Sequence, residues 1–162
     1  LNLMGADITL ENKRHVGAEP VADIRVRSAK LKGINIPEHL VPLAIDEFPA
    51  LFIAAACAEG ETILTGAKEL RVKESDRIQA MADGLQTLCI VAEPREDGIR
   101  IVGGQMQGGE IESHGDHRIA MAFAIASVAA QDQIIINDVA NVSTSFPNFV
   151  ELGNSLGFDV TS

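Results

Sequence analysis

One short segment of this chain, RVKESDRI at residues 71–78, concentrates the residue types that bind anions and transfer protons. Lys73 and Arg77 are cations that pair with phosphate or carboxylate groups, and Glu74 is a carboxylate that can carry a proton. The pattern predicts that this segment opens a helix. A helix N-terminus already presents partial positive charge, so cations there lower stability unless an anionic ligand compensates. A solvated cluster of surface charges is the alternative interpretation of this segment alone.

Two aspartates mark further helix starts with similar residues. Asp46 and Asp116 each precede an apolar segment of helical length, and both are placed as N-caps, whose carboxylates accept N–H bonds. Capping alone is a sufficient explanation for each aspartate. However, His117 and Arg118 follow Asp116 and are again cations in a first helical turn. Breaking the same local rule at two corresponding points indicates a function that compensates for it.

These helix starts can form one site if they converge in space. Helix N-termini bind phosphates and carboxylates through free N–H groups, and arginine adds bidentate pairs with the same oxyanions. Lys73, Arg77 and Arg118 would then form a site for several anionic groups. Asp46 and Glu74 would be its candidate proton carriers.

The elements that must position these residues follow an α/β (α+β) pattern with internal repetition. Each of the two aspartates opens an apolar helix, a polar turn and a β-rich strand, followed by a second helix and another strand. The predicted strands are 6–12, 22–28, 31–36, 61–67, 89–94, 98–103, 109–113, 133–138 and 158–161. The predicted helices are 47–58, 73–88, 117–130 and 147–156. The unit is therefore βαβαββ, with one nearly complete copy and parts of its neighbours in one domain piece.

The pattern of apolar residues predicts which layer lies inside. Helices 47–58 and 117–130 are apolar on almost every face, so they must be covered all round. We therefore expect buried helices with the sheets outside them. EDGIR at 96–100 predicts a hairpin turn, since Asp-Gly supplies positive φ angles. The predicted buried stripe of helix 73–88 consists of Ile78, Met81, Leu85 and Leu88.

Composition sets the broad class of the protein. Its 162 residues, 46% hydrophobic and 22% charged, can bury a sizeable core. A net charge of −10 argues against nucleic acid as a partner. No apolar run reaches the ~18–20 residues that span a membrane, and no signal peptide is visible. Cys57 and Cys89 lack CxxC spacing and are expected to be reduced core thiols of a cytoplasmic protein. The chain begins with Leu1 rather than Met, so we expect a fragment of a longer protein.

Three segments together resemble the C-terminal part of the 5-enolpyruvylshikimate-3-phosphate synthase family: RVKESDRI, GDHRIAMAFA and DEFP…AAACAEGET. KESDR followed by DHR is specific, and the resemblance spans essentially the whole chain. It implies a two-domain, inside-out prism of repeated βαβαββ units, whose buried helices point their N-termini at an interdomain cleft. Residues 1–162 would be a partial C-terminal domain, the end of one repeat plus roughly two more. The N-terminal domain of the same chain would be its missing partner.

The resemblance implies an enzyme of the shikimate pathway, which leads to the aromatic amino acids. Such an enzyme transfers the enolpyruvyl group of phosphoenolpyruvate to the 5-hydroxyl of shikimate 3-phosphate and releases phosphate, without a metal or other cofactor. Addition to phosphoenolpyruvate needs a base for the hydroxyl and an acid for the methylene carbon, so two carboxylates suit it. We expect a monomer when the chain is complete, and an inactive fragment in isolation.

The resemblance also implies roles for the carboxylates and for the lysine. Asp46 would contact the hydroxyls of the sugar-like ring and take part in proton transfer. Glu74 would be the second proton-transfer carboxylate, near the methylene of phosphoenolpyruvate. Lys73 would bind shikimate 3-phosphate.

The resemblance places the arginines on the second substrate. Arg77 and Arg118 would bind the carboxylate and phosphate of phosphoenolpyruvate, with Asp116 and His117 supporting the helix start. STSFPNF at 143–149 resembles the variant of the family that has no lysine in this motif, so no ligand contact is assigned there.

Two alternative functions have distinguishing features. The enolpyruvyl transferase acting on UDP-N-acetylglucosamine shares the fold, but it usually relies on an upstream reactive cysteine and does not carry KESDR. Inhibition by glyphosate rather than fosfomycin would separate the two enzymes. The second alternative is a non-catalytic module that binds a ligand or assists folding.

Overall fold

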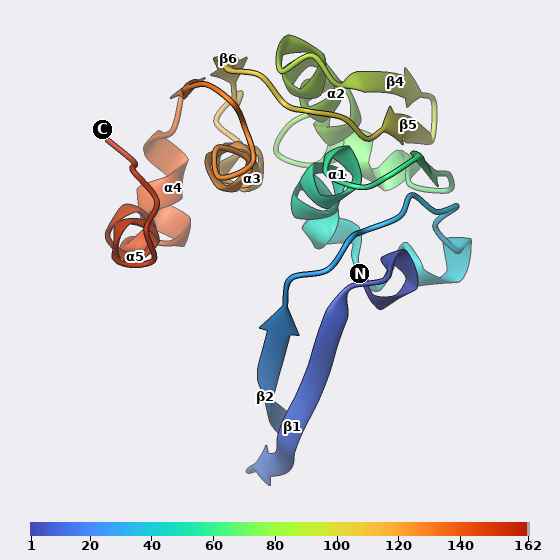
Figure 1. Cartoon of the computed structure of the whole chain (residues 1–162), viewed down its shortest axis with the longest axis vertical. Helices are drawn as coiled ribbons and strands as arrows, with labels where there is room; N and C mark the ends of the chain where they lie inside the picture. The colour runs from blue at the N-terminus through green and yellow to red at the C-terminus, as the bar shows by residue number, and fades with distance from the viewer. Residues whose placement is uncertain (162) are drawn as a thin grey trace.

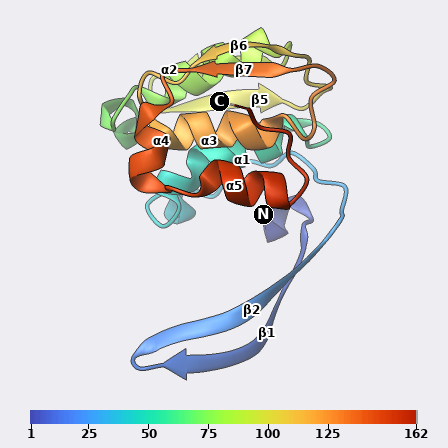
Figure 2. The same cartoon turned by 90° about the vertical axis from the view of Figure 1, so that its left-hand side faces the viewer.

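The computed structural model describes residues 1–161, which form a body of packed helices and sheets from which one long hairpin projects (Figures 1 and 2). The strands are β1 (Asp7–Val16), β2 (Glu19–Arg27), β3 (Glu61–Leu64), β4 (Val91–Arg95), β5 (Gly98–Val102), β6 (Gly109–Glu112) and β7 (Ile134–Asn137). The α-helices are α1 (Phe48–Ala56), α2 (Arg77–Thr87), α3 (His117–Ala126), α4 (Ala140–Ser145) and α5 (Phe149–Ser155). The 3-10 helices are η1 (Asn2–Met4), η2 (Glu38–Leu40), η3 (Ile45–Glu47) and η4 (Lys68–Val72). None of the helices in residues 1–161 is both long and apolar enough to span a membrane.

Helices α1, α2 and α3 form the centre of the body. Phe48 and Phe52 of α1 and Phe123 of α3 are buried in one shared core. The antiparallel sheet β3–β5–β4 packs against α1 and α2, and Figure 2 shows β5, β6 and β7 in a layer above α3 and α1. Residues along β3 and β4 alternate between exposed and more buried, as expected for strands with one face in water. The predicted arrangement of inner helices and outer sheets is confirmed for this body.

Two parallel strand contacts show the internal repetition predicted from the sequence. Strands β6 and β7 pair in parallel, and α3 lies between them in the chain. In the same way, Lys32 and Asn35 form parallel bridges to Glu59 and Ile63, and α1 lies between these segments. Each unit therefore carries a central helix between two parallel segments, which directs the starts of α1 and α3 to corresponding positions.

Helix α2 has the predicted buried face but begins later than predicted. Its N-cap is Asp76, whose carboxylate accepts a hydrogen bond from the backbone N–H of Gln79 at 3.0 Å. Lys73 and Glu74 therefore lie in the loop before the helix and not in its first turn, while Arg77 is the first helical residue. The predicted stripe is fully buried at Ile78, Met81, Leu85 and Leu88.

Strands β4 and β5 confirm the predicted hairpin but not its predicted turn. Arg95 pairs with Gly98, which leaves Glu96 and Asp97 as the connection, and neither Asp97 nor Gly98 has a positive φ. Gly98 serves a different purpose, since a Cβ atom there would lie 1.9 Å from the backbone oxygen of Leu64. The glycine thus permits the close approach of β3.

The segment 31–36 forms isolated bridges instead of the predicted strand. A Cβ atom at Gly33 would lie 2.1 Å from the backbone oxygen of Glu61, so the two backbones approach too closely for a regular ladder. Pro37 then ends the segment, because proline lacks a backbone N–H.

The C-terminal part also differs from prediction. Residues 158–161 form no strand, because the side-chain amide of Asn154 bonds both the N–H and the C=O of Val160. Helix α5 corresponds to the predicted helix 147–156, and the short α4 before it was not predicted.

Both cysteines are free and exposed, so the prediction that they are core thiols is wrong. Cys57 directly follows α1, and Cys89 lies beyond α2 with a φ of 63°. Their apolar neighbours in the sequence face the core, while the helix ends that carry the thiols reach the surface.

Candidate active site

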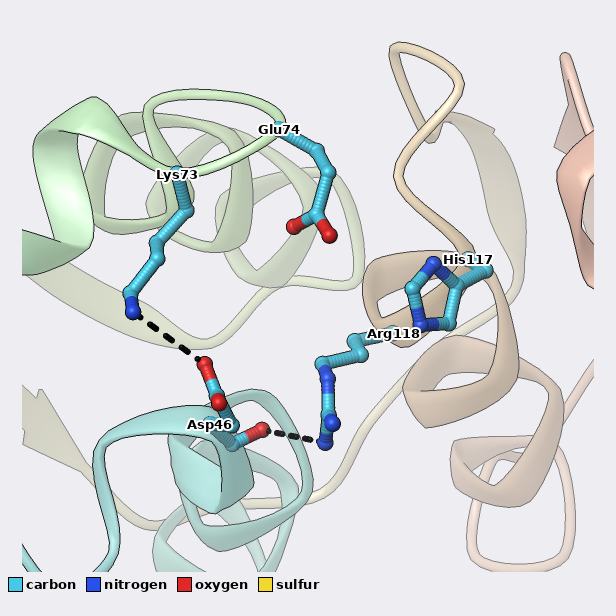
Figure 3. A pocket seen from close by; sticks show the side chains of 5 residues that line it. All are labelled: Asp46, Lys73, Glu74, His117 and Arg118. Carbon is cyan, nitrogen blue, oxygen red and sulfur yellow. Dashed lines mark hydrogen bonds and ion pairs between the residues drawn. The ribbon is translucent and has the colours of Figure 1, made fainter. Parts of the chain in front are cut away.

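One open hollow of about 490 Å³ lies between the segments that lead into α1, α2 and α3. Figure 3 shows its side chains around a shared space, with Lys73 and Glu74 contributed by the loop before α2. All of the lining residues belong to the set predicted from the sequence. They are Asp46, Lys73, Glu74, His117 and Arg118.

Asp46 lies in η3 and is not the N-cap of α1, so that prediction is wrong. The N-cap position is Glu47, which makes no side-chain capping bond. Pro49 in the first turn removes one backbone N–H that would need a partner. The Asp46 carboxylate instead lies 3.1 Å from Nη1 of Arg77 and 3.4 Å from Nζ of Lys73.

Arg77 is buried below the hollow, with a side chain only 1% exposed. Its Nε donates to Asp116 at 2.8 Å, Nη1 donates to Asp46, and Nη2 donates to Glu74. Burial lowers the pKa of Arg77, but Asp116, Glu74 and Asp46 outweigh it and raise the pKa above its ordinary value. Arg77 therefore holds three carboxylates from three segments in one cluster and does not itself line the hollow.

Asp116 is the buried carboxylate that joins the starts of α2 and α3. Its Oδ1 accepts a hydrogen bond from the backbone N–H of Arg118 at 3.0 Å, which confirms the predicted N-cap. Its Oδ2 accepts hydrogen bonds from Arg77 and from the Ser75 hydroxyl, the latter at 3.1 Å. Burial raises the pKa of Asp116, but Arg77 and these hydrogen bonds outweigh it and hold the pKa below its ordinary value.

The turn before α3 directs the first residues of that helix towards the hollow. His114 and Gly115 both have positive φ angles, of 54° and 68°, which reverse the chain between β6 and α3. The Ser113 hydroxyl fixes this turn by donating to the backbone oxygen of Asp138 at 2.7 Å. His117 consequently lines the hollow.

The cations that line the hollow are partly exposed and so accessible to a ligand. Lys73 is 22% exposed and lies 2.7 Å from the carboxylate of Glu69. The hydrogen bond to Glu69 and the charge of Asp46 raise the pKa of Lys73 despite partial desolvation. Arg118 is 33% exposed, and its Nη1 donates to the backbone oxygen of Asp46 at 2.8 Å and to Glu47 at 3.4 Å. An incoming anion can therefore pair with both cations without unpacking the core.

Asp46 is suited to remain ionised in this setting. Desolvation is the largest single influence and raises its pKa, but Lys73, Arg118 and Arg77 together outweigh it through charge and hydrogen bonds and lower the pKa below its ordinary value. A carboxylate that is ionised and faces an open hollow can accept a proton from a bound hydroxyl group.

Three polar residues that shape the site were not predicted from the sequence. Glu69 precedes Lys73 by four residues, a spacing that predicts an ion pair on a helical segment and could have revealed it. Glu47 and Ser75 gave no such signal, because their partners lie on other segments of the chain.

Taken together, the hollow offers two accessible cations beside two carboxylates, with buried Arg77 and Asp116 fixing the walls. Cations of this kind bind phosphate and carboxylate groups, and paired carboxylates can remove a proton from one atom and deliver one to another. The arrangement fits proton transfer on a small substrate that carries several anionic groups.

Comparison with known proteins gives a consistent family relationship. A sequence model described as "EPSP synthase (3-phosphoshikimate 1-carboxyvinyltransferase)" matches residues 1–152. The 3-phosphoshikimate 1-carboxyvinyltransferase of Alkalilimnicola ehrlichii is 67% identical over 162 residues, which is 99% of this chain and 36% of that protein. The protein of the same name from Nitrosococcus oceani is 68% identical over 160 residues, again 99% of this chain and 36% of the relative. The chain thus spans little more than a third of the length of these curated relatives.

Solved structures give the same relationship at the level of the fold. An EPSP synthase from Acinetobacter baumannii superposes with a TM-score of 0.94 at 59% identity, over 98% of this chain and 38% of that one. The enolpyruvyl transferase NikO from Streptomyces tendae superposes with a TM-score of 0.62 at 18% identity, over 98% of this chain and 34% of that one. The predicted enolpyruvyl transferase fold, mixed α/β with inner helices, is therefore confirmed.

Proposed function

The chain belongs to the EPSP synthase family, and on that premise we propose that it forms part of a 3-phosphoshikimate 1-carboxyvinyltransferase. The complete enzyme transfers the enolpyruvyl group of phosphoenolpyruvate to the 5-hydroxyl of shikimate 3-phosphate and releases phosphate, a step of the shikimate pathway. Residues 1–162 form part of its C-terminal domain, and the remaining domain of the same protein supplies the opposite wall of the site.

The observation that carries this proposal is the shared hollow between three helix starts. It presents the cations Lys73 and Arg118 and the carboxylates Asp46 and Glu74 to one ligand-sized space. Both proposed substrates are multiply charged anions with a phosphate group, so each needs cationic partners in the site.

The first step of the proposed reaction joins the two substrates. Asp46 accepts the proton of the 5-hydroxyl of shikimate 3-phosphate while the oxygen of that hydroxyl bonds to C2 of phosphoenolpyruvate. Glu74 in its protonated form delivers a proton to the C3 methylene. The product of this step is a tetrahedral adduct that keeps the phosphate on C2. The lowered pKa of Asp46 supports its assignment as the group that is ionised before the step.

The second step removes phosphate from the adduct. A proton leaves C3 for the Glu74 carboxylate, the C3–C2 double bond reforms, and the C2–O bond to phosphate breaks. The proton that Asp46 accepted in the first step is available for the departing phosphate. Atoms and charges balance without an external oxidant or reductant.

The cations divide the anionic groups between them. Lys73 binds shikimate 3-phosphate, and Arg118 binds the carboxylate or phosphate of phosphoenolpyruvate. Arg77 lies buried below the hollow, so its positive charge attracts phosphoenolpyruvate without direct contact. Its hydrogen bonds also hold Asp46 and Glu74 in place. His117 and Asp116 support the first turn of α3.

The test is an assay of the full-length protein with both substrates, following release of inorganic phosphate. We expect turnover with shikimate 3-phosphate and none with UDP-N-acetylglucosamine. Asp46→Asn and Glu74→Gln should each lower kcat about 100-fold or more, since general acid–base groups contribute about 10²–10⁴-fold. Unchanged turnover in both variants would refute the assignment of the proton carriers.

A second measurement compares turnover by residues 1–162 alone with turnover by the full-length protein, and it separates the proposed activity from a non-catalytic module. Robust turnover by residues 1–162 alone would show that the opposite domain is not needed. Absence of turnover by the full-length protein, with folding intact, would leave the non-catalytic module as the better interpretation.

A further inference from the structure

The loop that carries Lys73 and Glu74 has little backbone support of its own. Within residues 1–161, the backbone N–H groups of Glu74, Ser75 and Asp76 donate no hydrogen bond to another backbone group. The loop connects η4 to α2 and forms neither helix nor strand. Loops of this kind open locally at low free energy unless side chains hold them. The positions of two hollow-lining side chains therefore depend on side-chain contacts around the loop.

Arg71, in the last turn of η4, attaches the segment just before this loop to the β4–β5 hairpin. Its Nε donates to the backbone oxygen of Glu96 at 2.8 Å, and its Nη2 donates to the backbone oxygen of Arg95. Its Nη1 donates to Oδ2 of Asp76 at 2.7 Å. The planar fork of an arginine makes these bonds to three acceptors at once, which a lysine ammonium on a flexible stem does not reproduce.

Asp76 holds the other end of the same loop. Its Oδ1 caps α2 by accepting the N–H of Gln79, while its Oδ2 accepts the hydrogen bond from Arg71. The ion pair is partly shielded from water, since the two side chains are 24% and 39% exposed. The contact thus links the two ends of the segment 71–76. Arg71 attaches this segment to the β4–β5 hairpin, and Asp76 attaches it to the start of α2. Neither partner lines the hollow.

We infer that Arg71 and Asp76 are positioning residues that hold Lys73 and Glu74 at their places in the hollow. The expected effect on catalysis rests on the proposed function. The claim that Arg71 and Asp76 hold the loop does not depend on it. Displacing a reacting group by about 1 Å can cost 10²-fold in rate. Loss of the pair should therefore lower kcat/KM about 10- to 100-fold without removing any group that touches a substrate.

Asp76→Asn is the most informative variant. Asparagine is as good an N-cap as aspartate, so the cap on α2 is retained while the charge opposite Arg71 is lost. Arg71→Met removes all three donated bonds, and Arg71→Lys restores only the charge. The matched control is Lys68→Gln, which removes the exposed ion pair between Lys68 and Glu96 on the same hairpin turn.

The first measurement is steady-state kinetics of the full-length enzyme. In Asp76→Asn and Arg71→Met we expect the KM for shikimate 3-phosphate to rise about tenfold, because Lys73 moves, and kcat to fall, because Glu74 moves. The KM for phosphoenolpyruvate should change less, since Arg118 lies on another segment. Arg71→Lys should recover part of the loss. A partly unfolded enzyme would instead lose kcat with both KM values unchanged, and that result would overturn the inference.

The second measurement is amide hydrogen exchange of the same proteins, which needs no activity. Faster exchange confined to residues 70–76, a segment that includes the hydrogen-bonded N–H of Leu70 in η4, supports the inference if it occurs in Asp76→Asn and is absent from Lys68→Gln. Exchange that is unchanged, or raised equally along α2, overturns it. If the unsubstituted enzyme fails to turn over the two substrates, the proposed function fails, and hydrogen exchange alone then decides whether the pair holds the loop.

Discussion

The carboxylate of Asp116 lies 2.8 Å from Nε of Arg77, and it caps α3 at the same time. One buried ion pair therefore joins the first turns of α2 and α3, two helices that lie far apart in the sequence. Breaking such a pair leaves an uncompensated buried charge, whereas surface pairs contribute little. The hollow-lining side chains depend on this contact for their relative positions.

The first prediction concerns stability. Arg77→Met should lower the free energy of unfolding by about 3–5 kcal/mol, because Asp116 would stay buried without its partner. The matched control is Arg100→Met, since Arg100 also bonds two carboxylates, Glu61 and Glu93, but at the surface of the β3–β5–β4 sheet. The control should cost about 1 kcal/mol or less. Equal losses in urea unfolding would show that burial of the Arg77 cluster adds nothing.

The second prediction concerns pH. The pKa of folded Asp116 lies below its ordinary value of 3.8, so the unfolded state binds its proton first as the pH falls. The contribution of ionised Asp116 to the free energy of unfolding is fully present well above pH 3.8 and is lost as the pH falls through the pKa of the folded state. Asp116→Asn keeps an N-capping side chain but removes this titration.

The measurement is urea unfolding of both proteins from neutral pH to below the ordinary aspartate pKa. We expect the difference in unfolding free energy between native and Asp116→Asn proteins to be largest near neutral pH and to shrink on acidification. Glu96→Gln, which removes an exposed carboxylate paired with Lys68, is the control and should show a smaller change. A difference that does not vary with pH would contradict the pairing of Asp116 with Arg77.

The third prediction concerns ligand affinity. Arg118→Ala in the full-length enzyme should raise the KM for phosphoenolpyruvate about 10- to 100-fold, because a hydrogen bond between charged groups contributes about 1.5–3 kcal/mol. The fold should survive, since the backbone N–H of Arg118 still donates to Asp116. Arg25→Ala, on the projecting hairpin, is the control for loss of an exposed arginine. No change in the KM would show that the anion site lies elsewhere.

The fourth prediction concerns helix packing. A Cβ atom at Gly84 of α2 would lie 2.3 Å from the ring of Phe123 in α3. Helix propensity alone favours Gly84→Ala by about 1 kcal/mol, but overpacking costs about 1–3 kcal/mol. We expect a net loss of stability in thermal unfolding, whereas Asp83→Ala at the exposed neighbouring position should change little. A more stable Gly84→Ala protein would show that α2 and α3 can separate freely.

Much of this protein was predictable from local patterns. The apolar stripe from Ile78 to Leu88 predicted the buried face of α2, and the position of Asp116 predicted the N-cap of α3. The residue types at Lys73, Glu74 and Arg118 predicted an anion site with proton carriers, and the structure places all three around one hollow. Such features depend on helical periodicity and on side-chain chemistry, which the sequence contains directly.

Other features depended on contacts between distant segments. Asp46 has the sequence context of an N-cap, but Arg77 and Lys73 lie close enough to bind its carboxylate instead. Gly98 was predicted as a turn residue, but the close approach of Leu64 explains it.

The difference between the features that were predictable from the sequence and those that were not has a physical reason. The amino-acid sequence determined where the three central helices lie along the chain, which of their faces are apolar and which side chains can bind anions, since these follow from neighbours along the chain. Only the tertiary structure decided that Arg77 is buried under three carboxylates while Lys73 and Arg118 remain accessible. That distinction depends on how α1, α2 and α3 pack, because burial and charge pairing are properties of residues that meet in space.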